Sequence, residues 1–271
     1  MNAPIRQGFA AVALLLMISC AAPAPAAPAP EVRTDASAEA TISLALDRLD
    51  PLLQRYVEGN GVRYGAWRAS AEDRRTLDGV VETLEELSTA TLSASERAAL
   101  QINLYNTATV KLVLDGDPKN SIRDLSKLTL GFGVFHAKRL RYDGERVSLD
   151  SLEDQLRAET GDPRVHFAVN CASNSCPALL NEAFRGERLE QQLEQQSRAF
   201  LTRQDAIRLT SSTLELSKIF DWYANDFGGR EGVLEFVKRY SPAALGEQIE
   251  ARREELPVNF MSYDWGLNRL H

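Results

Sequence analysis

Apolar residues recur at helical spacing over most of the chain. Residues 37–56 and 71–87 carry leucines, isoleucines and valines at mostly helical intervals, which is typical of helices with one buried face. A third run, residues 93–114, is apolar on most sides, so we expect its helix to lie in the middle of the protein. This run opens with a Ser-X-X-Glu capping box and stops near an Asp-Gly-Asp-Pro sequence, which cannot continue a helix.

Shorter segments predict a few strands among these helices. Asp143-Gly144 lies between two short runs with strand character and indicates a two-residue hairpin, and residues 207–216 predict a second one. Residues 164–169 are expected to form a buried strand, and residues 258–263 a closing strand. Further helices are expected at residues 148–158, 187–201, 218–227, 232–240 and 243–253. The pattern indicates the α+β class, as a helix-rich single domain around a small antiparallel sheet.

The N-terminus has the features of an export signal. Residues 1–7 carry one Arg and no acid, and the apolar run at residues 9–18 is too short to span a membrane. Met17-Ile18-Ser19-Cys20 is close to the cleavage sequence of bacterial lipoproteins. We therefore expect residues 1–19 to be a signal peptide and Cys20 to be lipidated, with ordinary signal cleavage after a nearby Ala as the alternative.

The next segment differs in composition from the rest of the chain. Residues 21–30 are only Ala and Pro, so residues 20–40 are expected to be a tether that carries the lipid, followed by one globular domain at residues 41–271. The chain has 31 Lys and Arg against 38 Asp and Glu, a net charge of −7. An acidic protein of this kind is not expected to bind nucleic acid. The predicted location is the periplasmic side of the envelope, at the outer membrane.

The candidate chemistry is concentrated in residues 165–177. His166, Cys171 and Cys176 fall within this segment, although the whole chain has three His and three Cys. If residues 164–169 are a strand, His166 and Asn170 project from the same side of it. Pro177 favours the first turn of a helix, which would make Cys176 its N-cap, where unpaired N–H groups stabilise a thiolate.

This arrangement predicts a thiol hydrolase or acyl-transfer site. Cys176 or Cys171 would be the nucleophile and His166 the base, with Asn170 or Glu153 orienting the imidazole. The outline is that of papain- or transglutaminase-like enzymes, although papain-like enzymes place Cys before His in the chain and the order here is reversed. No cofactor is expected, and the substrate is not indicated.

Three other interpretations of the same residues stay open. In an oxidising compartment, Cys171 and Cys176 could form a structural disulfide, which would leave a non-catalytic envelope lipoprotein. The pair could also cycle between thiol and disulfide, without the usual Cys-X-X-Cys spacing. A zinc site of His166, Cys171 and Cys176 would lack a fourth ligand and matches no common zinc spacing.

Five short motifs together carry a resemblance to a known family. They are residues 103–106 (Asn-Leu-Tyr-Asn), 148–153 (Ser-Leu-Asp-Ser-Leu-Glu), 166–177, 219–223 (Ile-Phe-Asp-Trp-Tyr) and 263–268 (Tyr-Asp-Trp-Gly-Leu-Asn). In this order they resemble a bacterial and plant family known as "domain of unknown function 547", from about residue 50 to the C-terminus. The resemblance implies no established activity. Many bacterial members look as if they carry a His directly after the Glu of the second motif, where this chain has Asp154.

The remaining polar residues of these motifs have simpler interpretations. Asn103 and Asn106 lie in the apolar central helix, so we expect their amides to bind the backbone of adjacent loops. The acids and aromatic residues near the end of the chain are interpreted as packing of helix ends rather than as a sugar-binding cleft. This interpretation covers Asp221, Trp222, Tyr223, Asp226, Asp264 and Trp265.

Overall fold

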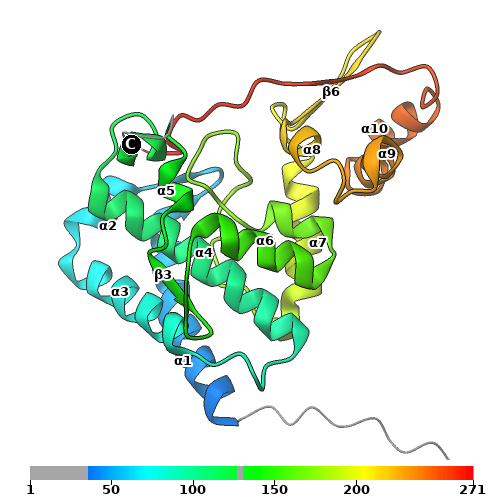
Figure 1. The fold of residues 1–271 in the computed structure, drawn as a ribbon. Coiled ribbons are helices and arrows are strands. Elements are labelled where there is room, and N and C mark those ends of the chain that lie inside the picture. The colour runs from blue at the N-terminus through cyan, green and yellow to red at the C-terminus, as the bar shows by residue number, and fades with distance from the viewer. Residues whose placement is uncertain (1–35, 127–130, 271) are drawn as a thin grey trace, which may run out of the picture. The chain divides into compact units, whose positions relative to one another are not determined.

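Helices predominate in the part of the chain that the computed structural model describes, residues 36–126 and 131–270 (Figure 1). The α-helices are α1 (Ala36–Tyr56), α2 (Tyr64–Ala69), α3 (Ala71–Glu86), α4 (Ala94–Gly116), α5 (Gly133–His136), α6 (Leu149–Thr160), α7 (Leu189–Phe200), α8 (Ile219–Trp222), α9 (Gly229–Tyr240) and α10 (Ala243–Glu250). Three 3-10 helices accompany them, η1 (Ile122–Leu125), η2 (Pro163–Phe167) and η3 (Gly186–Arg188). The helix-rich α+β class predicted from the sequence is confirmed.

The strands of the described residues are short and form three small sheets. They are β1 (Val57–Glu58), β2 (Gly61–Val62), β3 (Leu140–Tyr142), β4 (Glu145–Val147), β5 (Ile207–Leu209), β6 (Leu214–Leu216) and β7 (Val258–Phe260). Both predicted hairpins are present as the antiparallel pairs β3–β4 and β5–β6. The closing strand β7 pairs with β6 in parallel, so the third sheet is mixed.

Helix α4 lies among the other helices, as its apolar sequence predicts. It packs against α2, α3 and α6, and nearly every residue from Ala98 to Val110 is buried (Figure 1). The predicted capping box is present, because the Ser93 hydroxyl accepts from the Glu96 N–H while the Glu96 carboxylate accepts from the Ser93 N–H. The helix ends at Asp117, which adopts the left-handed conformation.

Two clusters of buried apolar side chains meet at residues 165–167. One cluster is built on helices α1 to α6, and the other on α8 to α10 with the third sheet, while α7 contributes side chains to both. Val165 belongs to the first cluster and Phe167 to the second, although one residue separates them. Residues 163–167 are therefore fixed by packing on both sides, and this position determines where the following loop lies.

The structure corrects three local predictions. Residues 164–169 are not a strand, because residues 163–167 form the 3-10 helix η2. Residues 177–180 are not helical, so Pro177 does not open a helix. The helix expected at residues 218–227 is limited to α8, which gives way to turns after Trp222.

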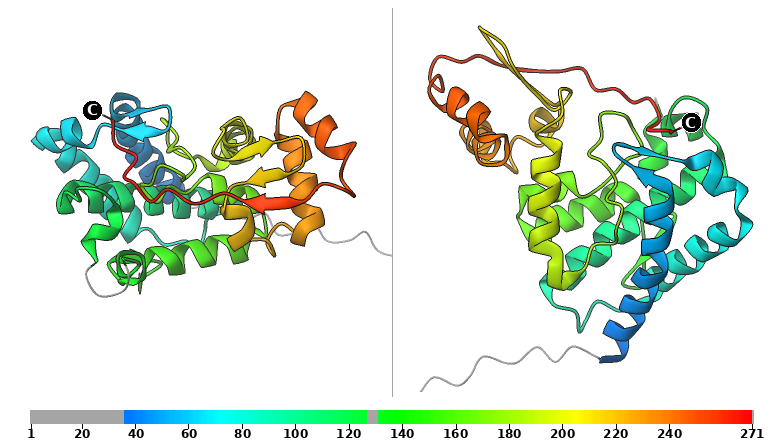
Figure 2. Two further views of the ribbon diagram at one scale, coloured as in Figure 1. Left: turned by 90° about the horizontal axis from the view of Figure 1, so that it is seen from above. Right: turned by 180° about the vertical axis from the view of Figure 1, so that it is seen from behind.

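The C-terminal segment returns across the fold after β7. It runs extended from the third sheet to the neighbourhood of α2 and α5 (Figure 2). On its way the Gly266 carbonyl accepts from the Asn174 N–H, and Leu267 N–H donates to the Asn120 carbonyl. This path brings the last motif of the chain over the loop that carries the cysteines.

The predicted signal peptide and Cys20 lie outside the described residues. Among the residues that are described, no helix is both long and apolar enough to cross a bilayer.

Candidate functional site

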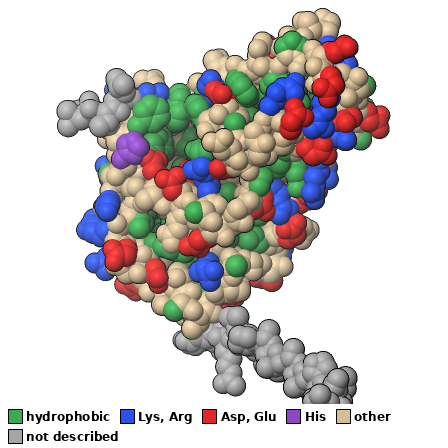
Figure 3. Space-filling model, turned by 45° about the vertical axis from the view of Figure 1, so that its right-hand side comes forward, with side chains coloured by type: hydrophobic (Ala, Val, Ile, Leu, Met, Phe, Trp, Pro, Cys, Tyr) green, Lys and Arg blue, Asp and Glu red, His purple; other side chains and the backbone are tan. Residues whose placement is uncertain are grey.

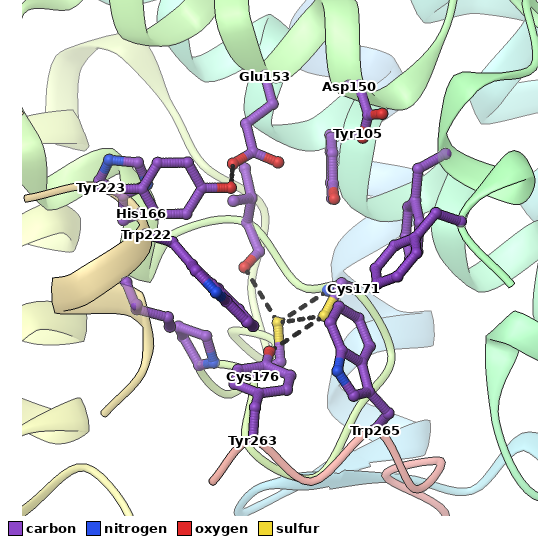
Figure 4. Close-up of a pocket in the computed structure, with 15 residues that line it drawn as sticks. Tyr105, Asp150, Glu153, His166, Cys171, Cys176, Trp222, Tyr223, Tyr263 and Trp265 are labelled. Atoms are coloured by element: carbon purple, nitrogen blue, oxygen red, sulfur yellow. Dashed lines mark hydrogen bonds between the residues drawn. The ribbon is translucent and has the colours of Figure 1, made fainter. Parts of the chain in front are cut away.

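A cavity of about 340 Å³ opens beside the loop of residues 171–176. On the face seen in Figure 3, hydrophobic side chains gather in a hollow, and Figure 4 shows the residues around the cavity. Its walls are formed by Tyr105, Phe132, Phe135, Asp150, Glu153, His166, Val169, Cys171, Cys176, Pro177, Ile219, Trp222, Tyr223, Tyr263 and Trp265.

All five sequence motifs contribute to this cavity. Tyr105 comes from the first motif, Glu153 from the second, Cys171 from the third, Trp222 from the fourth and Trp265 from the fifth. The motifs are far apart in the sequence, so their convergence is a property of the fold. A shared cavity accounts for their occurrence together in one chain.

The two cysteines are in direct contact and both are free thiols. The Cys171 thiol donates to the Cys176 sulfur at 2.9 Å, and the Cys176 sulfur also accepts from the Cys171 N–H at 2.9 Å (Figure 4). The Cys171 sulfur further contacts the hydroxyls of Ser173 at 3.0 Å and Tyr263 at 3.4 Å. Cys171 is partly exposed, whereas Cys176 is 5% exposed.

These surroundings make the two thiols chemically unequal. When Cys171 ionises, the Cys176 thiol can turn its proton toward the new thiolate, and this hydrogen bond lowers the pKa of Cys171. Burial raises the pKa of Cys176 well above its ordinary value. The prediction that Cys176 is an N-cap residue is wrong because no helix follows it. Of the two thiols, Cys171 is therefore the one that ionises more readily.

The hydrogen-bond partner of His166 is Asp226 and not a cysteine. Its Nε2 is 2.8 Å from an Asp226 carboxylate oxygen, and Arg157 donates to both oxygens of the same carboxylate. Among the described residues, no hydrogen bond joins His166 to either cysteine, although all three line the cavity. Burial lowers the pKa of His166 to about 4, so the imidazole is neutral at pH 7.

Glu153 projects into the cavity from α6. Its Oε1 accepts a hydrogen bond of 2.8 Å from the Tyr223 hydroxyl, and the Tyr223 ring packs on the His166 ring with centroids 4.0 Å apart. The other carboxyl oxygen faces the open space (Figure 4). Burial raises the pKa of Glu153, which increases its protonated fraction. Glu153 therefore does not orient His166 directly, but it is a proton donor or acceptor at the cavity wall.

Three buried asparagines hold the loop in place. Asn170 donates to the Pro177 carbonyl and accepts from the Ala172 N–H, which ties the two ends of the cysteine loop. Asn106 donates to the Ala168 carbonyl and accepts from the Asn170 N–H, and Asn103 makes the same pair of bonds with the backbone of Phe184. The prediction that Asn103 and Asn106 bind adjacent loops is confirmed. Asn170 does not contact the imidazole and acts on the loop instead.

The aromatic residues interpreted as packing also form the cavity wall. Tyr263 and Trp265 have ring centroids 4.7 Å apart, and Trp222 lies 4.8 Å from Tyr263 and 5.9 Å from Trp265. Trp222 is nevertheless 46% exposed, and all three line the cavity. The packing interpretation was therefore incomplete for Trp222, Tyr223 and Trp265. Asp264 does fit it, since its carboxylate accepts from Asn174 and Gly266.

The remaining polar candidates are accounted for by nearby partners. Asp226 holds His166 and Arg157, and Asp221 pairs with Lys218. Asp154 is 71% exposed and pairs with Arg157, outside the cavity lining. His136 pairs with Asp150, which lines the cavity. Within residues 36–126 and 131–270, no group of three His, Cys, Asp or Glu side chains is placed to hold a metal ion, so the zinc interpretation gains no support.

Several members of the site could not be singled out from the sequence. Tyr105 was noted only within its motif, and Phe132 and Phe135 lie outside the motifs. Arg157, which pairs with Asp226 next to His166, was not singled out either. A usable signal was present for Tyr105, because every motif of the resemblance supplies at least one residue to the cavity. Treating the motifs as parts of one site would have included it.

Fold and site define a helix-rich α+β protein with a pair of thiols at the wall of an aromatic cavity. Residues 89–201 match the family described as "Protein of unknown function, DUF547", which confirms the predicted resemblance over this part of the chain. The matched segment includes the first three motifs and both cysteines. No curated protein and no solved structure matches the chain, so the papain- or transglutaminase-like layout stays a prediction.

Proposed function

We propose that this protein is an exported thiol enzyme that hydrolyses or transfers acyl groups, with Cys171 as the nucleophile. The observation that carries the proposal is the placement of the Cys171 sulfur. It lies at the cavity wall beside the Cys176 thiol and the Ser173 and Tyr263 hydroxyls, all within hydrogen-bonding distance. Such groups stabilise a thiolate, which is the reactive form of cysteine.

The proposed reaction has two balanced steps. In the first, the Cys171 thiolate forms a C–S bond to the carbonyl carbon of an ester, and the leaving alcohol takes a proton from the Glu153 carboxyl as its C–O bond breaks. In the second, water attacks the thioester and gives a proton to the Glu153 carboxylate. The C–S bond then breaks, which returns the Cys171 thiolate and releases the acid. If an amine replaces water, the second step yields an amide.

Other residues support these two groups. Tyr223 orients the Glu153 carboxyl through its hydroxyl, and His166 supports the Tyr223 ring from behind. We therefore assign His166 a positioning role in place of the base role expected from the sequence. Ala172, between the cysteines, has φ 61°, a left-handed conformation that costs free energy for a residue with a Cβ. Strain of this kind is common where a loop must present a reactive group.

A small activated ester tests the proposal. We expect p-nitrophenyl acetate to acetylate the reduced protein at Cys171, seen by mass spectrometry as a thioester that hydroxylamine removes. Carrying out the experiment on Cys20→Ser leaves Cys171 and Cys176 as the cysteines of the chain. Adding Cys171→Ser should abolish the thioester, whereas adding Cys176→Ser should retain it. A thioester on Cys176, or none on either thiol, would contradict the proposal.

One observation favours the alternative of a structural disulfide. The two sulfurs already lie 2.9 Å apart, and a disulfide requires about 2.05 Å, so a small movement would join them in an oxidising compartment. The oxidised protein would have no nucleophile at this site. The alternative is then a non-catalytic envelope lipoprotein whose cysteine loop is closed by Cys171–Cys176.

We also propose that the protein is exported and anchored in the membrane through a lipid on Cys20. The support is the sequence alone, a short apolar run that ends at a lipoprotein-like cleavage sequence and is followed by an Ala/Pro tether. The location that follows is the periplasmic side of the envelope, at the outer membrane. No nucleic-acid partner is proposed for this acidic chain.

A further inference from the structure

We propose that the cavity recognises an organic ammonium group, so that the substrate of the site, or the amine that accepts its acyl group, is cationic. That the ammonium compound is a substrate rests on the proposed thiol enzyme. Binding of the ammonium group can be measured without any chemical reaction.

Aromatic rings form a large part of the wall. They are Tyr105, Phe132, Phe135, Trp222, Tyr223, Tyr263 and Trp265. Figure 4 shows the labelled Trp and Tyr residues on different sides of the open space. Aromatic faces attract cations through the ring quadrupole, and several rings around one space are a known means of binding quaternary ammonium groups.

The charged residues of the wall also favour a positively charged ligand. Among the described residues, the lining includes the carboxyls of Asp150 and Glu153 and no Lys or Arg. Burial raises the pKa of both carboxyls, and a cation bound beside them would favour their ionised form again. In a cavity with mostly apolar walls, such a carboxylate attracts a cation more strongly than it would in water. An anionic ligand would be desolvated opposite these carboxyls with no basic group of the described lining to pair with, which is costly.

Two arginines that are not part of the lining contact three of its aromatic rings. Arg123 lies 4.4 Å from the centroid of Phe132 and 5.2 Å from that of Trp265, and Arg157 lies 4.7 Å from that of Tyr223. Arg157 is paired with the carboxylates of Asp154 and Asp226. The rings of this wall therefore already bind cations of the protein itself.

The hydroxyl of Tyr105 adds a polar group to the cavity wall. Tyr105 lines the cavity and is 3% exposed, and its hydroxyl is not one of the buried polar atoms left without a partner among the described residues. Figure 4 shows this oxygen directed into the cavity, on the same side as Glu153. A phenol hydroxyl can donate a hydrogen bond to a ligand or accept one from it. The cavity therefore offers a polar position next to the carboxyl and within the aromatic wall.

Three probes of the same shape and different charge test the inference by isothermal titration calorimetry. Choline carries a trimethylammonium group, 3,3-dimethyl-1-butanol replaces its nitrogen with carbon, and 3,3-dimethylbutanoate carries a negative charge. We expect choline to bind the full-length protein about tenfold more tightly than the alcohol, and the carboxylate not to bind measurably. Equal affinity for choline and the alcohol would overturn the inference, as would no binding of any probe.

Variants then locate the binding. Trp222→Leu and Glu153→Gln should each remove most of the preference for choline over the alcohol. The matched controls are Phe260→Leu, at an exposed aromatic residue of β7, and Glu247→Gln, at an exposed acid of α10, and both should bind like the wild type. A preference for choline that survives both cavity substitutions would place the binding elsewhere and overturn the inference.

The choline measurement on Cys171→Ser separates this inference from the proposed enzyme. Retained binding in a variant that no longer acetylates is the expected result. Loss of the thioester in the wild type with intact choline binding would remove the enzyme and leave the ammonium site. Normal acetylation without choline binding would remove the ammonium site and leave the enzyme.

Discussion

The imidazole of His166 is enclosed by an acidic partner on one side and an aromatic ring on the other. Its side chain is 2% exposed, its Nε2–H donates to the Asp226 carboxylate, and Tyr223 packs against the ring. Protonation would place a second positive charge next to Arg157, which shares the Asp226 carboxylate. Burial dominates, and the pKa falls to about 4 from an ordinary value of 6.5.

This shift predicts how stability depends on pH. Between pH 6.5 and 4 the unfolded chain binds a proton at His166 that the folded protein does not, so the contribution of His166 is present above pH 6.5 and lost as the pH falls toward 4. We expect the free energy of unfolding to be about 2 kcal/mol lower at pH 5 than at pH 7 because of this group. Urea denaturation at the two pH values measures it.

A variant isolates this contribution from the acids of the site. Burial raises the pKa of Glu153, which works in the opposite direction, whereas Asp226 titrates below this range because Arg157 lowers its pKa. His166→Gln should therefore lose less stability than the wild type between pH 7 and 5. His136→Gln leaves His166 in place, so the contribution of His166 should remain. An unchanged pH dependence in His166→Gln would show that the imidazole is not kept neutral.

The two thiols also differ in their hydrogen-bond partners and in their burial. Cys171 has several donors within reach and lies toward the opening, whereas Cys176 is buried and shares its sulfur with a backbone N–H. From sequence alone Cys176 was favoured through its expected position at a helix start. The preference for Cys171 comes first from its hydrogen bond with Cys176 and then from Ser173, both set by how the loop folds. The Tyr263 hydroxyl, 92 residues away, adds to it, and no local pattern encodes that contact.

At the scale of elements, the sequence predicts the helices well and the central loop poorly. The helices α1, α3, α4, α6 and α7 were predicted close to their observed positions, because apolar spacing and capping residues are local signals. Ser148, for example, caps α6 as expected. The two hairpins were likewise marked by their turn residues.

The segment around His166 shows why the remainder could not be predicted. A short apolar run between polar residues reads equally as a strand or as a buried turn. Here Val165 and Phe167 enter different hydrophobic clusters, so the backbone winds into a 3-10 helix instead of extending along a sheet. Tertiary packing decides this local conformation.

The cavity itself is also a product of long-range arrangement. Its residues come from α4, α6, α8, the cysteine loop and the extended C-terminal segment. The sequence identified Glu153, His166, Cys171 and Cys176 as candidates, and the structure brings them to one cavity. It could not indicate that Tyr223 would join Glu153 and His166, or that aromatic residues would surround the thiols.

In the proposed whole molecule, a folded domain follows a tether that is anchored to the membrane by a lipid. We expect the wild type to fractionate with membranes, because bacterial lipoproteins carry several acyl chains and one chain alone binds only marginally. Cys20→Ser should move the protein to the soluble periplasmic fraction, as measured by immunoblotting of separated fractions. Cys171→Ser serves as the matched control and should stay with the membranes.

One result would contradict the lipid anchor. A fully soluble wild type whose mature N-terminus is an Ala beyond Cys20 would show ordinary signal cleavage. That outcome would remove the lipid anchor and leave the cavity and its thiols unaffected.

Selective alkylation tests the central claim most directly, because it asks which thiol of the native protein is reactive. Cys20→Ser protein is treated briefly with iodoacetamide at about pH 6, with and without reductant, and the modified peptides are identified by mass spectrometry. The account predicts that Cys171 is labelled well ahead of Cys176 and without reductant, because its lowered pKa gives it more thiolate than an ordinary thiol has at this pH. Labelling of Cys176 first, or of neither cysteine until reductant is added, would contradict it.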